Sequence, residues 1–281
     1  MSGWRDWVLA AAMAANLTAM CGCNDACARE PSTPVMPCGG EVIARGAART
    51  VIDGRTFVLD DGREVRLAAI EVPRLPKPQQ PNGPPGGTAA KGALTALLAG
   101  AEIVLSRAQP QPSDRYGRIF AYAVATRDGV EHFAEAELIA AGLARVAAQV
   151  GSHACATDLH RRESAAREAK LGLWADPYYD LLDADEPAAV LAQRGRFALV
   201  EGKVLSVRES GATIYVNFGR RWSEDFTVTI LKRNQRSFAA AGLEPKRLAG
   251  RRVRVRGWIE ERGGPWIEAS HPEQIELADG E

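Results

Sequence analysis

The segment that most constrains the fold is Arg49–Ile70, RTVIDGRTFVLDDGREVRLAAI, in which apolar and polar residues alternate. Alternation with a period of two is typical of β-strands that bury one face. Asp60–Gly62 interrupts this pattern, and an Asp-Gly pair tolerates the positive φ that tight hairpin turns need. The segment therefore predicts short strands joined by a hairpin turn.

Helical and strand patterns alternate along the next hundred residues. The proline-rich segment 74–87 fits neither a helix nor a central strand, so we expect a loop there. Beyond it, helices are predicted to end near glycines, and Thr157 or Asp158 is the expected N-cap of the last one. The predicted helices are 88–100, 131–144 and 156–174.

A second β-rich region follows a predicted linker, residues 177–195. Residues 196–278 read as three strands, a short helix and two more strands, which is the order of a five-stranded OB-type barrel. The fold class expected is mainly β with accessory helices (α+β), with a barrel domain over residues 43–176 and an OB-like barrel over 196–278.

The strands of this second region carry many cations with aromatic residues between them. OB barrels bind single strands with such mixtures, stacking bases on rings in a positive groove. Simple alternation in the run RRVRVRGW instead predicts a solvated polar face opposite a valine face. Both interpretations stay open for Arg252, Arg254, Arg256, Tyr215, Phe218, Trp222 and Trp258.

The N-terminal residues differ in composition from the rest. A weakly positive start, a short apolar run and the small-x-small sequence Ala26–Ala28 predict a signal peptide, residues 1–28, followed by an extended lead-in, 29–42. We therefore expect a periplasmic or secreted protein with no transmembrane helix after removal of the signal. A lipid anchor on Cys21 or Cys23 stays open.

Net charge and cysteine content limit how the chain could bind nucleic acid and which cysteines could form a disulfide. The formal net charge is zero, so nucleic acid would have to bind at a local basic patch rather than through a global field. Three of the five cysteines would leave with the signal peptide. The remaining pair, Cys38 and Cys155, is predicted to form a disulfide in an oxidising compartment.

Five short runs in residues 48–174 resemble the thermonuclease (staphylococcal nuclease-like) family, whose domain is an OB-type barrel with helices. They are VIDGRT, VRLAAIEVP, DRYGRIFAY, LIAAGLARV and AKLGLW, and they occur in the order of that family. The resemblance implies phosphodiester hydrolysis with one calcium ion. Such enzymes use two aspartates and a backbone carbonyl for the metal, a glutamate for the attacking water and two arginines for the phosphate.

The resemblance assigns these roles to positions of this chain. The two phosphate arginines are kept as Arg66 and Arg118. Glu71 and the Val72 carbonyl stand where a second calcium aspartate and a carbonyl ligand would be. Arginines replace the other two functional groups: Arg55 stands at the first calcium aspartate and Arg74 at the general-base glutamate. Two nucleotide-pocket tyrosines fall on Ala148 and Val150.

These replacements disfavour calcium. A guanidinium about 4 Å from a dication costs on the order of 8 kcal/mol at an effective dielectric near 20. Arg55, Arg66, Arg74 and Arg118 would instead converge on an anion site that needs no metal. Two alternatives are that these arginines only make surface ion pairs, and that Arg66 pairs with Glu71. Asp53 and Asp114 are candidates for a relocated base, although we expect them to shape turns.

The leading functional hypothesis is an exported thermonuclease-like protein with a phosphate- or nucleic-acid-binding cleft and lost or weak calcium-dependent cleavage. A working phosphodiester hydrolase with a rearranged calcium site is one alternative, and a non-catalytic periplasmic scaffold is another. Outside the site, His160 is expected in solvent on a charged helix face and Trp174 in the core.

Overall fold

The computed structural model describes residues 38–77, 83–110, 113–114, 116–221 and 223–278. They belong to one compact unit, Pro34–Glu281. The predicted signal peptide, most of the lead-in and Trp222 lie outside these residues. In the described part of the chain, no helix combines the length and apolar character needed to cross a membrane.

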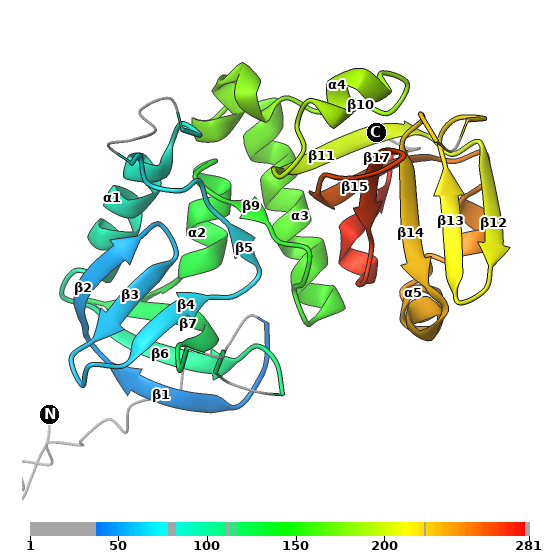
Figure 1. Cartoon of the computed structure of the whole chain (residues 1–281). Coiled ribbons are helices and arrows are strands. Elements are labelled where there is room, and N and C mark those ends of the chain that lie inside the picture. Colours follow the sequence, from blue (N-terminus) through cyan, green and yellow to red (C-terminus); the bar gives the residue numbers. More distant parts are fainter. Residues whose placement is uncertain (1–37, 78–82, 111–112, 115, 222, 279–281) are drawn as a thin grey trace, which may run out of the picture. The chain divides into compact units, whose positions relative to one another are not determined.

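The first half of the chain builds a seven-stranded sheet that curves onto itself (Figure 1). Its strands pair in the order β1-β6-β7-β4-β3-β2. The seventh strand, β8, pairs with β7 and lies outside this path. The first and last strands of this path, β1 and β2, are consecutive in the chain and separated by Ala47, so one bent segment links the two edges of the sheet. The strands are β1 (Val42–Gly46), β2 (Ala48–Asp53), β3 (Thr56–Leu59), β4 (Glu64–Leu67), β6 (Glu102–Arg107), β7 (Ile119–Arg127) and β8 (Val130–Phe133).

The alternation seen in the sequence produces this sheet. Phe57, Leu59, Val65 and Leu67 are fully buried in the first core, whereas intervening residues reach the surface. The predicted hairpin turn is confirmed, because β3 pairs with β4 and Gly62 in the turn has a φ of 91°. That positive φ is open to glycine at little cost, which is why Asp-Gly predicts the turn.

Three helices cover this core: α1 (Gly87–Leu98), α2 (Ala134–Ala140) and α3 (His153–Glu168). Gly100 and Gly142, with φ of 67° each, follow the first two, as predicted. The predicted start of α3 was wrong. Its N-cap is Ser152, whose side chain accepts a hydrogen bond from the backbone N–H of Cys155, so the helix begins four residues before Thr157.

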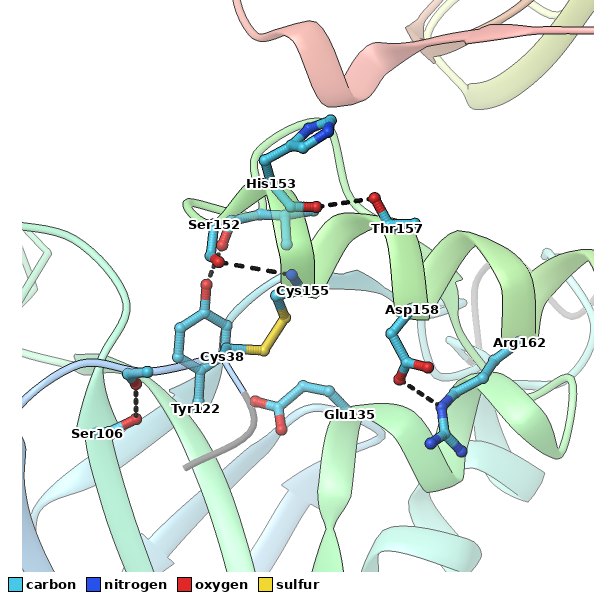
Figure 2. The surroundings of a disulfide bond; sticks show 12 residues. Cys38, Ser106, Tyr122, Glu135, Ser152, His153, Cys155, Thr157, Asp158 and Arg162 are labelled. Atoms are coloured by element: carbon cyan, nitrogen blue, oxygen red, sulfur yellow. Dashed lines mark hydrogen bonds and ion pairs between the residues drawn. A yellow bond between two sulfur atoms is a disulfide. The ribbon is translucent and has the colours of Figure 1, made fainter. Parts of the chain in front are cut away.

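A disulfide joins Cys38 to Cys155, across 117 residues, as predicted (Figure 2). It fastens the segment before β1 to the first turn of α3, and both cysteines are buried in the first core. Glu135 of α2 lies near the disulfide with its carboxyl fully buried. Burial raises the pKa of Glu135 well above its usual value.

The second half of the chain forms two sheets around one core. A four-stranded sheet has the order β10-β11-β15-β18, and a five-stranded sheet has the order β12-β13-β14-β17-β16. Valines and isoleucines from both sheets share this second core with Phe238. The strands are β10 (Leu182–Asp183), β11 (Phe197–Lys203), β12 (Ser206–Ser210), β13 (Thr213–Asn217), β14 (Thr227–Leu231), β15 (Arg252–Trp258), β16 (Glu260–Arg262), β17 (Gly264–Glu268) and β18 (Ile275–Leu277).

The two halves share a strand path. In each, three strands pair antiparallel, a helix follows the third, and the third strand then pairs in parallel with a late strand. The parallel pairs are β4 with β7 and β14 with β17. The mainly β, OB-type fold class is confirmed for the first half. The OB-like nature of the second half stays a prediction, which the shared path supports.

Residues 177–195, predicted as a linker, contain short elements that pack into two of the buried clusters. Val190 is buried in the second core, and Tyr179 lies in a third cluster with Trp174, which is buried as predicted. The domain boundaries themselves stay predictions. The remaining short elements are β5 (Ile70–Glu71), β9 (Arg145–Val146), α4 (Pro187–Leu191), α5 (Gln235–Ala240), η1 (Gly172–Ala175), η2 (Pro177–Tyr179), η3 (Lys232–Asn234), η4 (Pro245–Leu248) and η5 (Pro272–Gln274).

A buried ion cluster connects β15 to α3. Arg256 is fully buried and donates to Glu163 of α3 at 2.7 Å, to the Val146 carbonyl at 3.1 Å and to Glu276 of β18. Arg254, also on β15, pairs with Glu201 at 2.8 Å. The prediction of a solvated face was therefore wrong for both arginines. The alternation was read correctly, but α3 and acidic side chains cover the polar face.

His160 was also predicted in solvent, and this was wrong. Its side chain is only 14% exposed and lies 3.9 Å from Glu276. Burial, followed by the charge of Arg256, lowers the pKa of His160 to about 4. The charged neighbours of His160 along α3 suggested a solvated face, but β18 packs there.

Candidate functional site

The loop between β2 and β3 positions Arg55. The carboxylate of Asp53 accepts a hydrogen bond from the Arg55 backbone N–H at 2.9 Å, so Asp53 shapes the loop as expected. Gly54 is required here because a Cβ at this position would lie 2.6 Å from the Cβ of Ala90 on α1. The close approach of α1 thus fixes the backbone that presents Arg55.

Arg55 binds the strand that carries the retained acidic residue. Its Nη1 atom lies 2.8 Å from Glu71 Oε1 and donates to the Ile70 carbonyl oxygen at 2.9 Å. Both side chains are mostly buried, with 15% and 18% exposed for Arg55 and Glu71. The suggestion that Arg66 pairs with Glu71 was therefore wrong. Arg55 makes that ion pair, and its positive charge balances the negative charge of Glu71.

Arg66 lies next to this pair on β4, half-buried. Unlike Arg55, it makes no hydrogen bond and no ion pair with any residue that the structure describes. Burial lowers the pKa of Arg66, and the nearby charges of Arg55 and Arg118 lower it further, only partly offset by Glu71 and Asp53. An arginine stays protonated under these conditions. Arg66 is therefore a partly desolvated cation whose charge the surrounding protein does not balance.

Arg118, the second arginine expected to bind phosphate, is already engaged. Its Nε and Nη2 atoms lie 2.8 and 2.7 Å from Asp114 Oδ2, and Glu64 is 3.8 Å from its Nη1. The hydrogen bond that Arg118 donates to Asp114 is the main reason that the pKa of Arg118 is raised. Asp114 also accepts the backbone N–H groups of Tyr116 and Arg118, which makes it the turn cap expected.

Two cavities flank the Arg55–Glu71 pair. Both are lined by Arg55, Arg66 and Glu71. The smaller, about 320 Å³, also reaches Asp114 and Ala148. The larger, about 440 Å³, also reaches Arg74 and Val72, and the Arg74 side chain is exposed. Three of the four predicted arginines thus meet at one cavity, whereas Arg118 lines neither.

The two positions expected at a nucleotide pocket have different surroundings. Ala148 lines the smaller cavity, where its methyl group leaves open space. Val150 is buried, and its carbonyl oxygen accepts a hydrogen bond from the Tyr122 hydroxyl. The larger cavity is also lined by four residues that the sequence did not suggest, Arg145, Tyr178, Arg196 and Phe197, and by Trp258, which the sequence offered as a stacking residue of the second barrel.

The side chains at this site do not fit a calcium ion. Calcium takes six to eight oxygen ligands, usually with several carboxylates. Here the guanidinium of Arg55 holds both Glu71 Oε1 and the Ile70 carbonyl, and Arg55 itself supplies no ligand. Within the described residues, no group of three or more His, Cys, Asp or Glu side chains is arranged to hold a metal.

Residues 64–176 match the profile of the SNase family, described as staphylococcal nuclease homologue. The matched part begins at β4 and ends after η1, so it contains Arg66, Glu71, Arg74 and Arg118 but not the Arg55 loop. The pairing of β3 with β4 places that loop in the same site. No curated protein matches the chain.

Proposed function

We propose, because residues 64–176 belong to the staphylococcal nuclease homologues, that this chain binds phosphate groups of nucleic acid without calcium-dependent cleavage. The family supports a nuclease or a nucleic-acid-binding role. The side chains of this chain favour the second of these, because they offer cations in place of a metal site.

The observation that carries the proposal is the state of Arg66. A half-buried guanidinium with no hydrogen-bond or ion-pair partner among the described residues has five N–H donors in a planar fork, which suits a phosphate group. Burial also makes a hydrogen bond to an anion stronger than it would be in water. Glu71 does not compete for Arg66, because Arg55 occupies the Glu71 carboxylate at 2.8 Å.

The same contacts argue against hydrolysis. A general base must be free to accept a proton from the attacking water. Arg74 stands at the position of the family's base, and an arginine does not act as a base at neutral pH. The two candidates for a relocated base already accept hydrogen bonds: Asp53 from the Arg55 backbone N–H, and Asp114 from the Arg118 side chain.

We also propose that the protein is exported to the periplasm or secreted. The support is the sequence of residues 1–28 together with the Cys38–Cys155 disulfide, since such bonds persist in oxidising compartments. Whether Cys21 or Cys23 carries a lipid stays open.

A binding and cleavage assay with the purified chain, its disulfide intact, tests the function. Labelled single- and double-stranded DNA are titrated in calcium and in chelator. We expect binding in both buffers and no cleavage. Arg66→Ala should weaken binding about 10- to 150-fold, the equivalent of one lost hydrogen bond to a charged group.

Arg49→Ala is the matched control, because Arg49 is an exposed arginine on β2 that lines neither cavity. It should bind like the unchanged protein. Cleavage that stops in chelator would reject the proposal in favour of a working phosphodiester hydrolase. An absence of binding to either DNA would instead favour a scaffold role.

A further inference from the structure

The larger cavity combines two kinds of side chain. Its described lining contains six cationic side chains and one carboxylate, Glu71. It also contains four aromatic rings, those of Tyr178, Tyr179, Phe197 and Trp258. We name this 440 Å³ cavity the aromatic cleft. Its cations come mainly from the family-matched part of the chain, and its rings come from residues beyond that part.

Two of the cations are held in place by these rings. The guanidinium of Arg145 lies about 5 Å from the ring centres of Tyr179 and Phe197, at 5.1 and 5.0 Å, and donates to the Phe197 carbonyl at 2.6 Å. Arg196 lies 3.2 Å from the ring centre of Tyr178 and donates to the Tyr178 carbonyl at 2.7 Å. Burial lowers the pKa of both arginines, yet both remain charged, so they place fixed positive charge along the cleft.

Trp258 differs from the other rings because it is free to contact a ligand. It is the last residue of β15, and 43% of it is exposed. Its ring meets Phe197 at an interplanar angle of 71°, with the centroids 6.0 Å apart. This edge-on contact fixes the position of the indole and leaves much of its surface in the cleft. An exposed tryptophan among cations is suited to stack on an unpaired base.

We propose that the aromatic cleft binds single-stranded nucleic acid, with phosphates on Arg66, Arg74 and Lys77 and a base stacked on Trp258. This inference rests on the proposed function and adds to it the substrate class and a second contact. A duplex has its base faces covered by neighbouring pairs, so only a single strand presents a face to the indole. An acidic peptide would use the cations but would gain nothing from the ring.

The experiment measures the affinity of the purified chain for a ten-residue oligothymidylate, for a duplex of equal length, for oligoglutamate and for pyrophosphate. Trp258→Ala should weaken oligothymidylate binding about 5- to 150-fold, the range for loss of one stacked base. Trp258→Phe should restore most of the affinity. Pyrophosphate, which contacts only cations, should bind Trp258→Ala unchanged.

Val130→Ala is the control, because Val130 is an exposed apolar residue on β8 that lies outside the aromatic cleft and was not a candidate for binding. It should leave oligothymidylate binding unchanged. The inference is overturned if Trp258→Ala binds like the unchanged protein while Arg66→Ala is weakened, and in that case the proposed function stands. Equal or tighter binding of duplex or oligoglutamate also overturns it. If no DNA binds and pyrophosphate does not bind, the proposed function fails as well.

Discussion

The two halves of the chain follow the same strand path, but strand β4 of the first half and strand β15 of the second use their arginines in opposite ways. In the first half, Arg66 on β4 lies half-buried with no partner among the described residues. In the second half, Arg254 and Arg256 on β15 are more deeply buried, and carboxylates hold both of them. A basic strand is therefore not by itself a binding surface. Whether an acidic side chain reaches the guanidinium decides between ligand binding and structural support.

The largest expected effect tests this difference by removing one arginine from each half. Arg256→Ala leaves Glu163 and Glu276 without their buried cation, so we expect a loss of about 3–5 kcal/mol in the free energy of unfolding. Arg66→Ala removes no hydrogen bond or ion pair with a described residue and should cost less than about 1 kcal/mol. Urea unfolding curves measure both. Equal losses would contradict the division of roles.

The second effect concerns the disulfide, which exists only in the first half among the described residues. Replacement of Cys38 and Cys155 by serine should lower the free energy of unfolding by about 2–4 kcal/mol, because the bond closes a loop of 117 residues. The comparison is made with the unchanged protein under non-reducing conditions. In reductant, the two proteins should unfold at the same urea concentration. A difference that persists in reductant would mean that the serines, not the lost bond, cause it.

The third effect is a pH dependence centred on the ion cluster. The pKa of His160 is about 4 in the folded protein, lowered by burial and then by Arg256, against 6.5 when unfolded. Arg254, Glu163 and Glu276 also face it. Between these pH values the unfolded chain binds the proton and the folded chain does not, so stability falls as pH drops from 6.5 to 4. The loss should be on the order of 2–3 kcal/mol.

His160→Asn is the variant that isolates this titration. Its stability should change less between pH 6.5 and 4.5 than that of the unchanged protein, as measured by urea unfolding at each pH. Below pH 4.5, Glu276 adds a loss in the same direction, because Arg256 holds its pKa at about 2 against the opposing effect of burial. A pH profile that His160→Asn leaves unaltered would assign the effect to other groups.

The smallest expected effect separates the two arginines that the family resemblance treats alike. Arg118→Ala should weaken DNA binding only about 2- to 5-fold, because Asp114 already occupies the fork of Arg118 at 2.7 and 2.8 Å. Arg66→Ala should weaken it by an order of magnitude or more. Both affinities come from the same titration. Losses of similar size would show that Asp114 releases Arg118 when the ligand binds.

The parts of the fold that the sequence predicted depend on residues close together in the chain. The β3–β4 hairpin follows from local alternation and an Asp-Gly turn, and two helix ends follow from glycines. The disulfide was predictable despite its long loop, because export would leave one pair of cysteines. The start of α3 was missed because Ser152 lies before a run, HACA, with no amphipathic pattern to mark it as helix.

The missed parts of the site depend on contacts between distant residues. Alternation placed Arg254 and Arg256 correctly on a polar face, but nothing near them in the sequence indicates that Glu163 covers Arg256 from α3. Arg55 was expected at the site. Its ion pair with Glu71 could not be predicted, because it depends on where β5 and α1 lie in the fold. The rings of the aromatic cleft lie beyond the recognised family motifs. The sequence indicated Trp258 as a possible stacking residue of the second barrel, but not that it lies in the same cavity as Arg66.

The hydrogen bond from Arg256 to the Val146 carbonyl oxygen has a practical consequence for experiments on fragments of the protein. Val146 belongs to β9, which pairs with β5, the strand that carries Glu71. A fragment cut after residue 176 would lose this contact and would leave Glu163 without its counter-charge. The nuclease-like half is therefore not expected to keep its structure as an isolated fragment. Removal of the second half would disturb the backbone that supports the arginines of the site.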